Sequence, residues 1–201
     1  MEQLVVAGQP FVAEVPLNRL PALAATALER FEDVPGFPGT KAFAADAEAW
    51  GAPCRAVVAY TESFFTQQLQ GVTHNLVQCQ KKLLGLEQSL RAWREGKRRG
   101  KRPTVRQIRA RARAILSQQF IKELFQISVT EENGLPALRY AVNHAALDQL
   151  VHERLGRTLL LSAKTPGEPQ ELIGNRYIES LRKSGSPVYL RLAQQTGGEI
   201  E

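Results

Sequence analysis

The chain has 201 residues, of which 43% are hydrophobic and 7% aromatic, and it carries a formal net charge of +6. This length allows one or two domains around a mainly aliphatic core. No apolar run approaches the roughly 18 residues of a membrane-spanning helix, and the N-terminus lacks the basic and then apolar layout of a signal peptide. Two cysteines, Cys54 and Cys79, are too few for a disulfide framework or a metal site, so we expect a cytoplasmic protein with reduced thiols.

The first part of the chain predicts a partial β-sheet. Residues 2–6 and 11–15 are short apolar runs bounded by glycine and proline, a pattern typical of strands. Residues 17–31 are rich in alanine and leucine and predict a helix. Residues 41–50 and 55–60 flank a Gly-Ala-Pro turn and pair as a hairpin in the interpretation we favour. In the alternative, the alanine-rich first arm is a short helix.

The most regular feature of the sequence is an apolar repeat whose steps alternate strictly between four and three residues. Its members are Phe65, Leu69, Val72, Leu76, Cys79, Leu83, Leu86, Leu90 and Trp93. A period of about 3.5 residues places all of them on one narrow stripe of a helix. No proline interrupts the segment from Thr61 to Glu95, which would form a helix roughly 50 Å long. A stripe this regular needs a partner surface.

The expected partner is a second helix after a basic turn from Gly96 to Pro103. The spacing of three and four residues is repeated there by Val105, Ile108, Ala112, Ile115 and Gln119. Thr104 is placed to cap the start of this helix. The two patterns together predict a long antiparallel helical hairpin from about 61 to 119.

The region after this hairpin predicts two strands, a helix and a third strand. Residues 123–130 alternate in polarity, Asn133-Gly134 is a tight-turn signal, and residues 137–142 supply the return strand. Asn143 is placed to cap a helix that runs to about Leu155. Residues 158–161 form a buried-strand pattern. This order indicates an α+β or α/β body that is interrupted by a long helical excursion.

Basic residues are concentrated in one segment of the sequence. Eleven lysines and arginines lie between Arg91 and Arg113 with a single acid, Glu95, whereas the remaining residues hold 15 basic and 19 acidic groups. Such a concentration is typical of a phosphate-binding surface, and the alternative is a solvated turn. Because arginines continue into the second predicted helix, we favour nucleic acid. The candidate nucleic-acid-binding residues are Arg91, Arg94, Lys97, Arg98, Arg99, Lys101, Arg102, Arg106, Arg109 and Arg113.

The spacing of residues in the sequence does not identify a set of catalytic residues. The chain has no glycine-rich phosphate loop, no HExxH and no nucleophile elbow. The three aspartates, Asp33, Asp46 and Asp148, fall in different predicted elements. Two-metal phosphoryl transfer requires carboxylates that converge on ions about 3.5–4 Å apart. His144 and His152 lie two turns apart on one predicted helix and are interpreted as structural. We therefore assign no catalytic or metal-binding residue.

Three segments resemble a known family: FVAEVPLNRL, RAVVAYTESFFTQQLQGVTHNLVQCQKKLLGLEQSL and QQFIKELFQISVTEENGLPALRYAVNHAALDQLVHERLGRTLLLS. They look like bacterial insertion-sequence transposases of the DDE, ribonuclease-H-like class. The resemblance is to the branch with a long insertion between the second aspartate and the glutamate, and it covers roughly residues 10 to 162. It implies a partial ribonuclease-H-like sheet and a helical-hairpin insertion. In the intact family it implies DNA transposition by strand transfer, with a carboxylate triad and Mg²⁺.

The sequence departs from the family pattern at the catalytic positions. The two aspartates of the family would precede Met1, and the glutamate should follow the strand that ends near Leu161. The corresponding region contains Arg176, Tyr177 and Glu179 in the wrong order and spacing, so the catalytic glutamate is not carried over to Glu179. We expect a fragment that is inactive alone and binds no metal, with a changed reading frame after the last predicted strand.

The predicted organisation has four parts. A partial sheet and hairpin region covers 1–60, a helical hairpin with a basic tip covers 61–119, a β-hairpin, helix and strand cover 120–162, and a divergent tail with a composition that allows disorder covers 163–201. The predicted function is that of a DDE transposase fragment that contacts DNA through the basic tip. The alternative is a non-enzymatic coiled-coil and nucleic-acid-binding module that self-associates.

Overall fold

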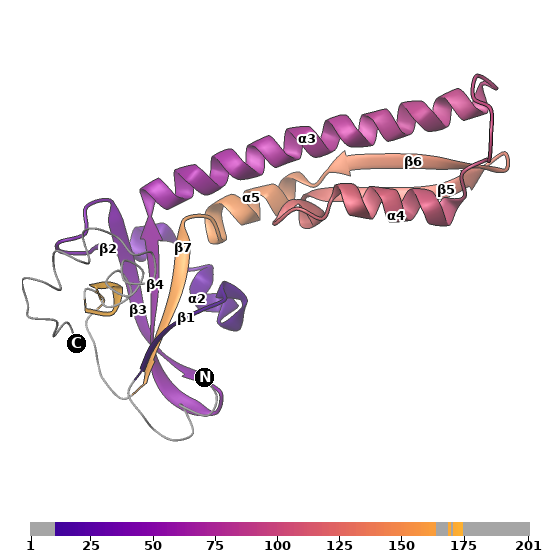
Figure 1. Ribbon diagram of the computed structural model, residues 1–201. Coiled ribbons are helices and arrows are strands. Elements are labelled where there is room, and N and C mark those ends of the chain that lie inside the picture. Colours follow the sequence, from indigo (N-terminus) through magenta and orange to yellow (C-terminus); the bar gives the residue numbers. More distant parts are fainter. Residues whose placement is uncertain (1–10, 164–168, 170, 175–201) are drawn as a thin grey trace, which may run out of the picture. The chain divides into compact units, whose positions relative to one another are not determined.

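The computed structural model describes residues 11–163, 169 and 171–174 (Figure 1). The fold is mixed α+β, with antiparallel sheets and one long helix. The chain divides into two compact units. Unit 1 contains the described residues up to Phe65 and those from Gly156 onward, and unit 2 contains Thr66–Leu155. The strand expected at 2–6 lies outside the described residues.

Unit 1 is built on a five-stranded sheet in which every pairing is antiparallel. Its strands are β1 (Phe11–Val15), β2 (Glu32–Asp33), β3 (Thr40–Ala49), β4 (Ala52–Thr61) and β7 (Arg157–Ala163), in the order β1-β7-β4-β3-β2. Strand β7, the last in sequence among the described residues, therefore lies between β1 and β4. Leu160 is the register partner of Glu14 on one side and of Val57 on the other.

Both faces of this sheet are covered by apolar side chains. Leu159 and Leu161 of β7 pack with Val58 and the partly buried leucines of the segment that follows β1. Leu160 points to the opposite face, where its cluster includes Leu172. Burial on both faces explains why the central strands have nearly continuous apolar runs instead of alternating polarity.

The prediction of a single helix over 17–31 is wrong. The chain forms three short turns there, η1 (Leu17–Arg19), α2 (Pro21–Ala24) and η2 (Leu28–Arg30). The physical reason is Arg157, a buried side chain on β7 whose Nη1 donates to the carbonyl oxygens of Ala24 and Thr26, both at 2.6 Å. Those carbonyls are oriented toward the guanidinium, and the helix ends at this point.

The hairpin favoured for 41–50 and 55–60 is confirmed, and the helical alternative for its first arm is wrong. Strands β3 and β4 pair from Thr40↔Thr61 to Ala49↔Ala52. The turn between them is formed by Trp50 and Gly51, with φ values of 53° and 74°.

Unit 2 contains two antiparallel strands and three α-helices within the described part of the chain. Its elements are α3 (Glu62–Arg94, which begins in unit 1), α4 (Val105–Ile115), η3 (Ile121–Leu124), β5 (Phe125–Glu132), β6 (Leu135–Val142) and α5 (His144–Glu153). The predicted caps are confirmed: the Thr104 hydroxyl accepts from the Gln107 amide at 3.3 Å, and the Asn143 side chain accepts from the Ala146 amide at 3.2 Å. Asn133 and Gly134, both with positive φ, close the β5–β6 hairpin as expected.

The apolar stripe of α3 is the buried side of this helix. All nine stripe residues are buried or half-buried, and Leu83 and Leu90 are 0% and 2% exposed. Immediately beside the stripe, Leu84 is 45% exposed. The 3.5-residue period therefore identified the packed face correctly.

The predicted partner of the stripe requires correction. Helix α4 has 11 residues against 33 in α3, and it ends at Ile115 rather than at 119. The Cys79 thiol donates to the Ile115 carbonyl at 3.1 Å, which joins the middle of α3 to the end of α4. A helix this short cannot cover the whole stripe, and residues of β6 also face α3 across a hollow described below. A hairpin of two long helices is thus not what unit 2 contains.

We predict that Leu83→Ala destabilises unit 2 by about 2–5 kcal/mol, because it removes a fully buried side chain and leaves a cavity. The matched control is Leu84→Ala, at the exposed neighbouring position, which should cost no more than about 0.5 kcal/mol. Hydrogen exchange of the α3 amides under increasing denaturant measures both variants. Similar losses for the two variants would contradict the burial of the stripe.

We predict a large cost for Gly156→Ala in unit 1. Gly156 has a φ of 74°, and a Cβ there would lie 2.6 Å from the Phe65 Cβ and 2.8 Å from the Tyr60 Cε2. Gly51→Ala is the control, since its φ is also 74° but nothing lies within 4 Å. The backbone strain of about 1–2 kcal/mol is common to both variants, and overpacking adds about 1–3 kcal/mol only at 156. Equal denaturation midpoints would contradict the close contact.

Candidate nucleic-acid interface

The candidate basic residues lie on three consecutive parts of unit 2. Arg91 and Arg94 occupy the last turn of α3, the residues from 97 to 102 form the connection to α4, and the remaining arginines lie on α4 itself. We call these ten residues, together with Arg111 of α4, the basic surface. Every one of the eleven belongs to the exposed class. The sequence neighbours thus remain together on the surface of one unit.

Four residues of the basic surface make polar contacts within the unit. Arg94 pairs with Glu132 at 3.7 Å, Lys97 with Glu95 at 2.8 Å, and Arg98 donates to the Ser89 hydroxyl at 2.7 Å. Arg109 donates to the Val129 carbonyl at 3.3 Å. Among the residues that the structure describes, the other seven make no ion pair: Arg91, Arg99, Lys101, Arg102, Arg106, Arg111 and Arg113. Most of the positive charge is therefore not neutralised by this part of the chain.

Helix α4 separates apolar and basic side chains. Ile108 and Ala112 are 1% and 0% exposed, because this side of the helix packs in unit 2 next to β5 and β6. The arginines lie at other positions of the helix, and all of them are exposed. The anchored guanidinium of Arg109 reaches the backbone of β5 and fixes one flank of the helix.

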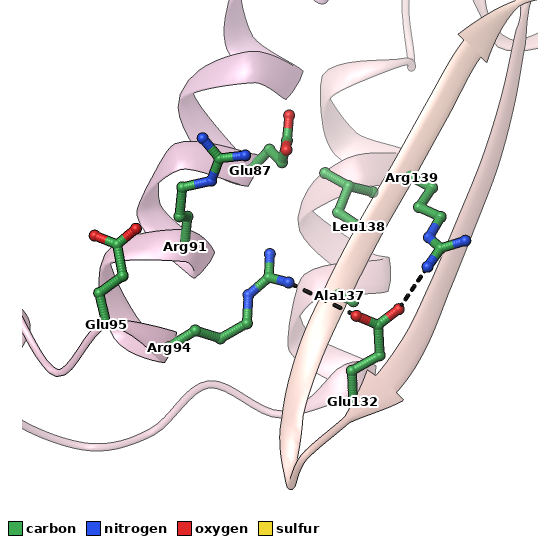
Figure 2. Close-up of a pocket in the computed structure, with 8 residues that line it drawn as sticks. All are labelled: Glu87, Arg91, Arg94, Glu95, Glu132, Ala137, Leu138 and Arg139. Carbon is green, nitrogen blue, oxygen red and sulfur yellow. Dashed lines mark hydrogen bonds and ion pairs between the residues drawn. The ribbon is translucent and has the colours of Figure 1, made fainter.

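A charged hollow of about 360 Å³ lies between the end of α3 and the β5–β6 hairpin (Figure 2). Its lining residues are Glu87, Arg91, Arg94, Glu95, Glu132, Ala137, Leu138 and Arg139. Glu132 bridges two arginines, with Oε2 3.7 Å from Arg94 and Oε1 3.0 Å from Arg139. This bridge connects the end of the hairpin to the last turn of α3. Its three arginines are matched by three glutamates, so the hollow itself has no excess positive charge.

Sequence reasoning missed Arg139 as a neighbour of the candidate surface. The side chain is 78% exposed and shares Glu132 with Arg94, although it is distant from the basic segment in the sequence. No local pattern marks it, because the β5–β6 register and the packing of α3 bring it there. Arg111, in contrast, belongs to the basic segment itself and is exposed like its neighbours.

Neighbouring residues of the basic surface lower the pKa of Glu95, the one acid in this segment. The hydrogen bond from Lys97 is the main cause of the lowered pKa of Glu95, and the charges of Lys97, Arg91 and Arg94 act in the same direction. Glu95 therefore stays ionised to a lower pH than it would without these neighbours. Near the hollow, burial raises the pKa of Tyr140, and the charge of Glu87 adds to this effect.

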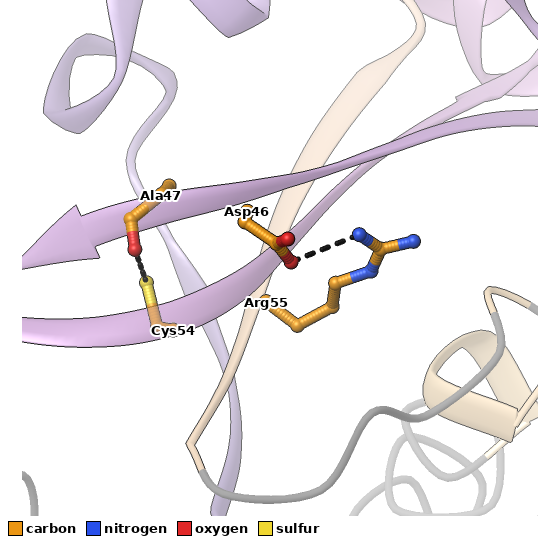
Figure 3. A network of polar contacts seen from close by, with 4 residues as sticks. All are labelled: Asp46, Ala47, Cys54 and Arg55. Carbon is orange, nitrogen blue, oxygen red and sulfur yellow. Dashed lines mark hydrogen bonds and ion pairs between the residues drawn. The ribbon is translucent and has the colours of Figure 1, made fainter.

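The three aspartates lie in separate elements. Asp33 is on β2, Asp46 on β3 and Asp148 on α5, and all three are exposed. Figure 3 shows Asp46 paired with Arg55 of β4 at 3.0 Å. The Asp46 side chain is 91% exposed.

In the described residues, no histidine or cysteine combines with these aspartates to form a metal-binding cluster. Beside the Asp46–Arg55 pair, the Cys54 thiol donates to the Ala47 carbonyl at 3.4 Å (Figure 3). No group of three or more His, Cys, Asp or Glu residues in the described ranges is arranged to hold a metal ion. Glu179 lies outside those ranges.

None of the protein-family models, curated proteins or solved structures compared with the chain matches it. The resemblance to DDE transposases therefore stays a prediction from the sequence. Of the helices within the described residues, none has the length and apolar character needed to cross a membrane.

We predict that the Glu95 carboxyl titrates below its ordinary pKa of 4.5, and that Lys97→Met moves the midpoint back toward 4.5. Because the folded-state pKa is lowered, this contact stabilises the folded chain above the ordinary value. That stabilisation is lost as the pH falls through the folded-state pKa. Carbon NMR of the Glu95 carboxyl measures the midpoint, with Lys81→Met as the control. An unchanged midpoint in Lys97→Met would refute the contact.

Proposed function

We propose that the chain binds DNA through its basic surface. The observation that carries this proposal is the exposure of eleven lysines and arginines between Arg91 and Arg113, with Glu95 as the one acid in that segment. A polyanion with closely spaced phosphates gains affinity from each cation that neutralises one of them and releases a counterion. Nine of the eleven have no ion pair in the described residues, so little competition from acidic side chains must be overcome.

The placement of the charges favours this function over a turn that is merely solvated. A solubilising turn needs cations only in the connection between the helices. In unit 2 the cations continue along α4, and Arg109 is anchored to β5 while Arg94 is anchored to Glu132. These anchors limit the freedom of the surface, which lowers the entropic cost of binding a ligand.

We propose a transposase origin for this DNA-binding chain. The support is the sequence resemblance, together with the position of unit 2 as an insertion between β4 and β7 of unit 1. In this proposal the unit 1 sheet is the partial ribonuclease-H-like part, and unit 2 is the insertion of the family. The exposed aspartates lie apart from one another, so the chain alone is proposed to bind DNA without strand transfer and without Mg²⁺.

Self-association through the apolar stripe is less well supported. Val72, Cys79, Leu83 and Leu90 are already buried within a single chain. The side chains of a dimer seam must be available to a second copy, which would require unit 2 to open. The alternative function is therefore supported mainly in its nucleic-acid-binding part.

We predict that DNA affinity falls steeply with salt concentration and that basic-surface variants reduce this slope. Neutralising six phosphates corresponds to a log–log slope of about −5. Replacing Arg99, Lys101 and Arg102 with glutamine should reduce its magnitude by about 3, at roughly 0.9 for each lost phosphate contact. Fluorescence anisotropy with a short DNA duplex measures the slope across a salt series.

The matched control replaces Lys81, Lys82 and Lys122 with glutamine. These three lysines are exposed in the same unit but lie outside the basic surface. Their replacement removes the same total charge as the replacement of Arg99, Lys101 and Arg102. The control should keep the wild-type slope. Equal reductions in both variants would show a general charge effect, and no binding by the folded chain at low salt would exclude the proposed function.

A further inference from the structure

The exposed side of α4 includes a line of uncharged residues, which phosphate neutralisation by the arginines does not require. Ala110 and Ala114 are exposed on the side of α4 away from the buried Ile108 and Ala112, and together with Gln107 they form a line of uncharged positions that we call the α4 ridge. Residues three, four and seven apart share a face of a helix. The ridge is therefore uncharged and, apart from Gln107, formed by methyl groups.

Arginines border the ridge on both sides. Arg106 and Arg113 are seven residues apart and lie along one flank, and Arg111 lies on the other flank. All three are exposed and make no ion pair in the described residues. The amide of Gln107 is held close to the helix start, since its Oε1 accepts from the Thr104 amide at 3.1 Å. The short, uncharged side chains of Ala110 and Ala114 thus lie between arginines on both sides of the helix.

We propose that α4 inserts into the major groove of B-form DNA, with the ridge toward the base edges and the flanking arginines toward the phosphates of the two strands. The major groove is about 12 Å wide and admits an α-helix. The 11 residues of α4 span about 16 Å, close to the rise of five base pairs. This inference rests on the proposed DNA binding and specifies how the same surface is used.

Single-stranded nucleic acid fits this surface poorly. Proteins that bind single strands stack bases on aromatic side chains, and residues 94–119 contain no phenylalanine, tyrosine or tryptophan. Trp93 belongs to the apolar stripe and is half-buried. The ridge also offers few groups that read bases, because alanine contacts only apolar edges such as the thymine methyl. Binding should therefore prefer duplex DNA with weak sequence dependence.

Duplex RNA provides a decisive comparison, because its phosphate charge is similar and its groove is not. The major groove of an A-form helix is deep and narrow and cannot be entered in this way. A surface that only neutralises phosphates would bind both duplexes, whereas a helix that enters the groove must prefer B-form DNA. The preference follows from the shape of the ridge and not from the number of arginines.

We expect the full chain to bind a DNA duplex at least about ten-fold more tightly than an RNA duplex of the same sequence and length, measured by anisotropy at one salt concentration. Ala110→Glu places a carboxylate on the ridge and should weaken DNA binding by about ten-fold while changing RNA binding little. The matched control is Ala145→Glu, the same substitution at an exposed position of α5. It should leave both affinities within about two-fold.

The outcomes separate this inference from the proposed function. Equal affinity for the DNA and RNA duplexes would overturn groove insertion. DNA binding itself would still stand if replacing Arg99, Lys101 and Arg102 with glutamine reduces the salt slope. Unchanged DNA affinity in folded Ala110→Glu also overturns the insertion. Absence of salt-dependent binding to either duplex overturns both.

Discussion

Burial of the apolar stripe of α3 is the constraint on which unit 2 depends. The helix is 33 residues long, and an isolated helix of this composition gains little stability from its backbone alone. Each fully buried leucine of the stripe contributes about 1.5–3 kcal/mol, and Leu83 and Leu90 are buried at positions seven residues apart. Within unit 2 the Cys79 thiol contacts the end of α4, and residues of β6 line a hollow together with the end of α3.

The same packing determines where the positive charge lies. Because Ile108 and Ala112 are the buried side of α4, its arginines lie on the exposed part of the helix, beside the uncharged ridge. Glu132 then connects the hairpin to α3 through Arg94 and Arg139. Exposed ion pairs of this kind add little to stability, about 0–1 kcal/mol. Their consequence is geometric, since they restrict how the last turn of α3 and the hairpin can move.

Unit 1 is organised differently, because apolar clusters pack on both faces of its sheet. The interior strand β7, the last in sequence among the described residues, contributes Leu159 and Leu161 to one face and Leu160 to the other. The buried Arg157 at its start is accommodated by the Ala24 and Thr26 carbonyls. The sheet of unit 1 therefore needs segments that precede unit 2 in the sequence and segments that follow it. Unit 2 is an insertion in the sequence of unit 1.

The sequence by itself determined the features that depend on neighbouring residues. The stripe of α3, the Thr104 and Asn143 caps, the Asn133-Gly134 turn and the concentration of charge follow from spacing or from one local hydrogen bond. Tertiary structure decided the rest. The expected helix over 17–31 is broken because Arg157 takes its carbonyls, α4 is too short to cover the stripe, and Arg139 reaches the candidate site through strand pairing. These contacts join residues far apart in the chain, whose encounter depends on the packing of the whole unit and not on any local pattern.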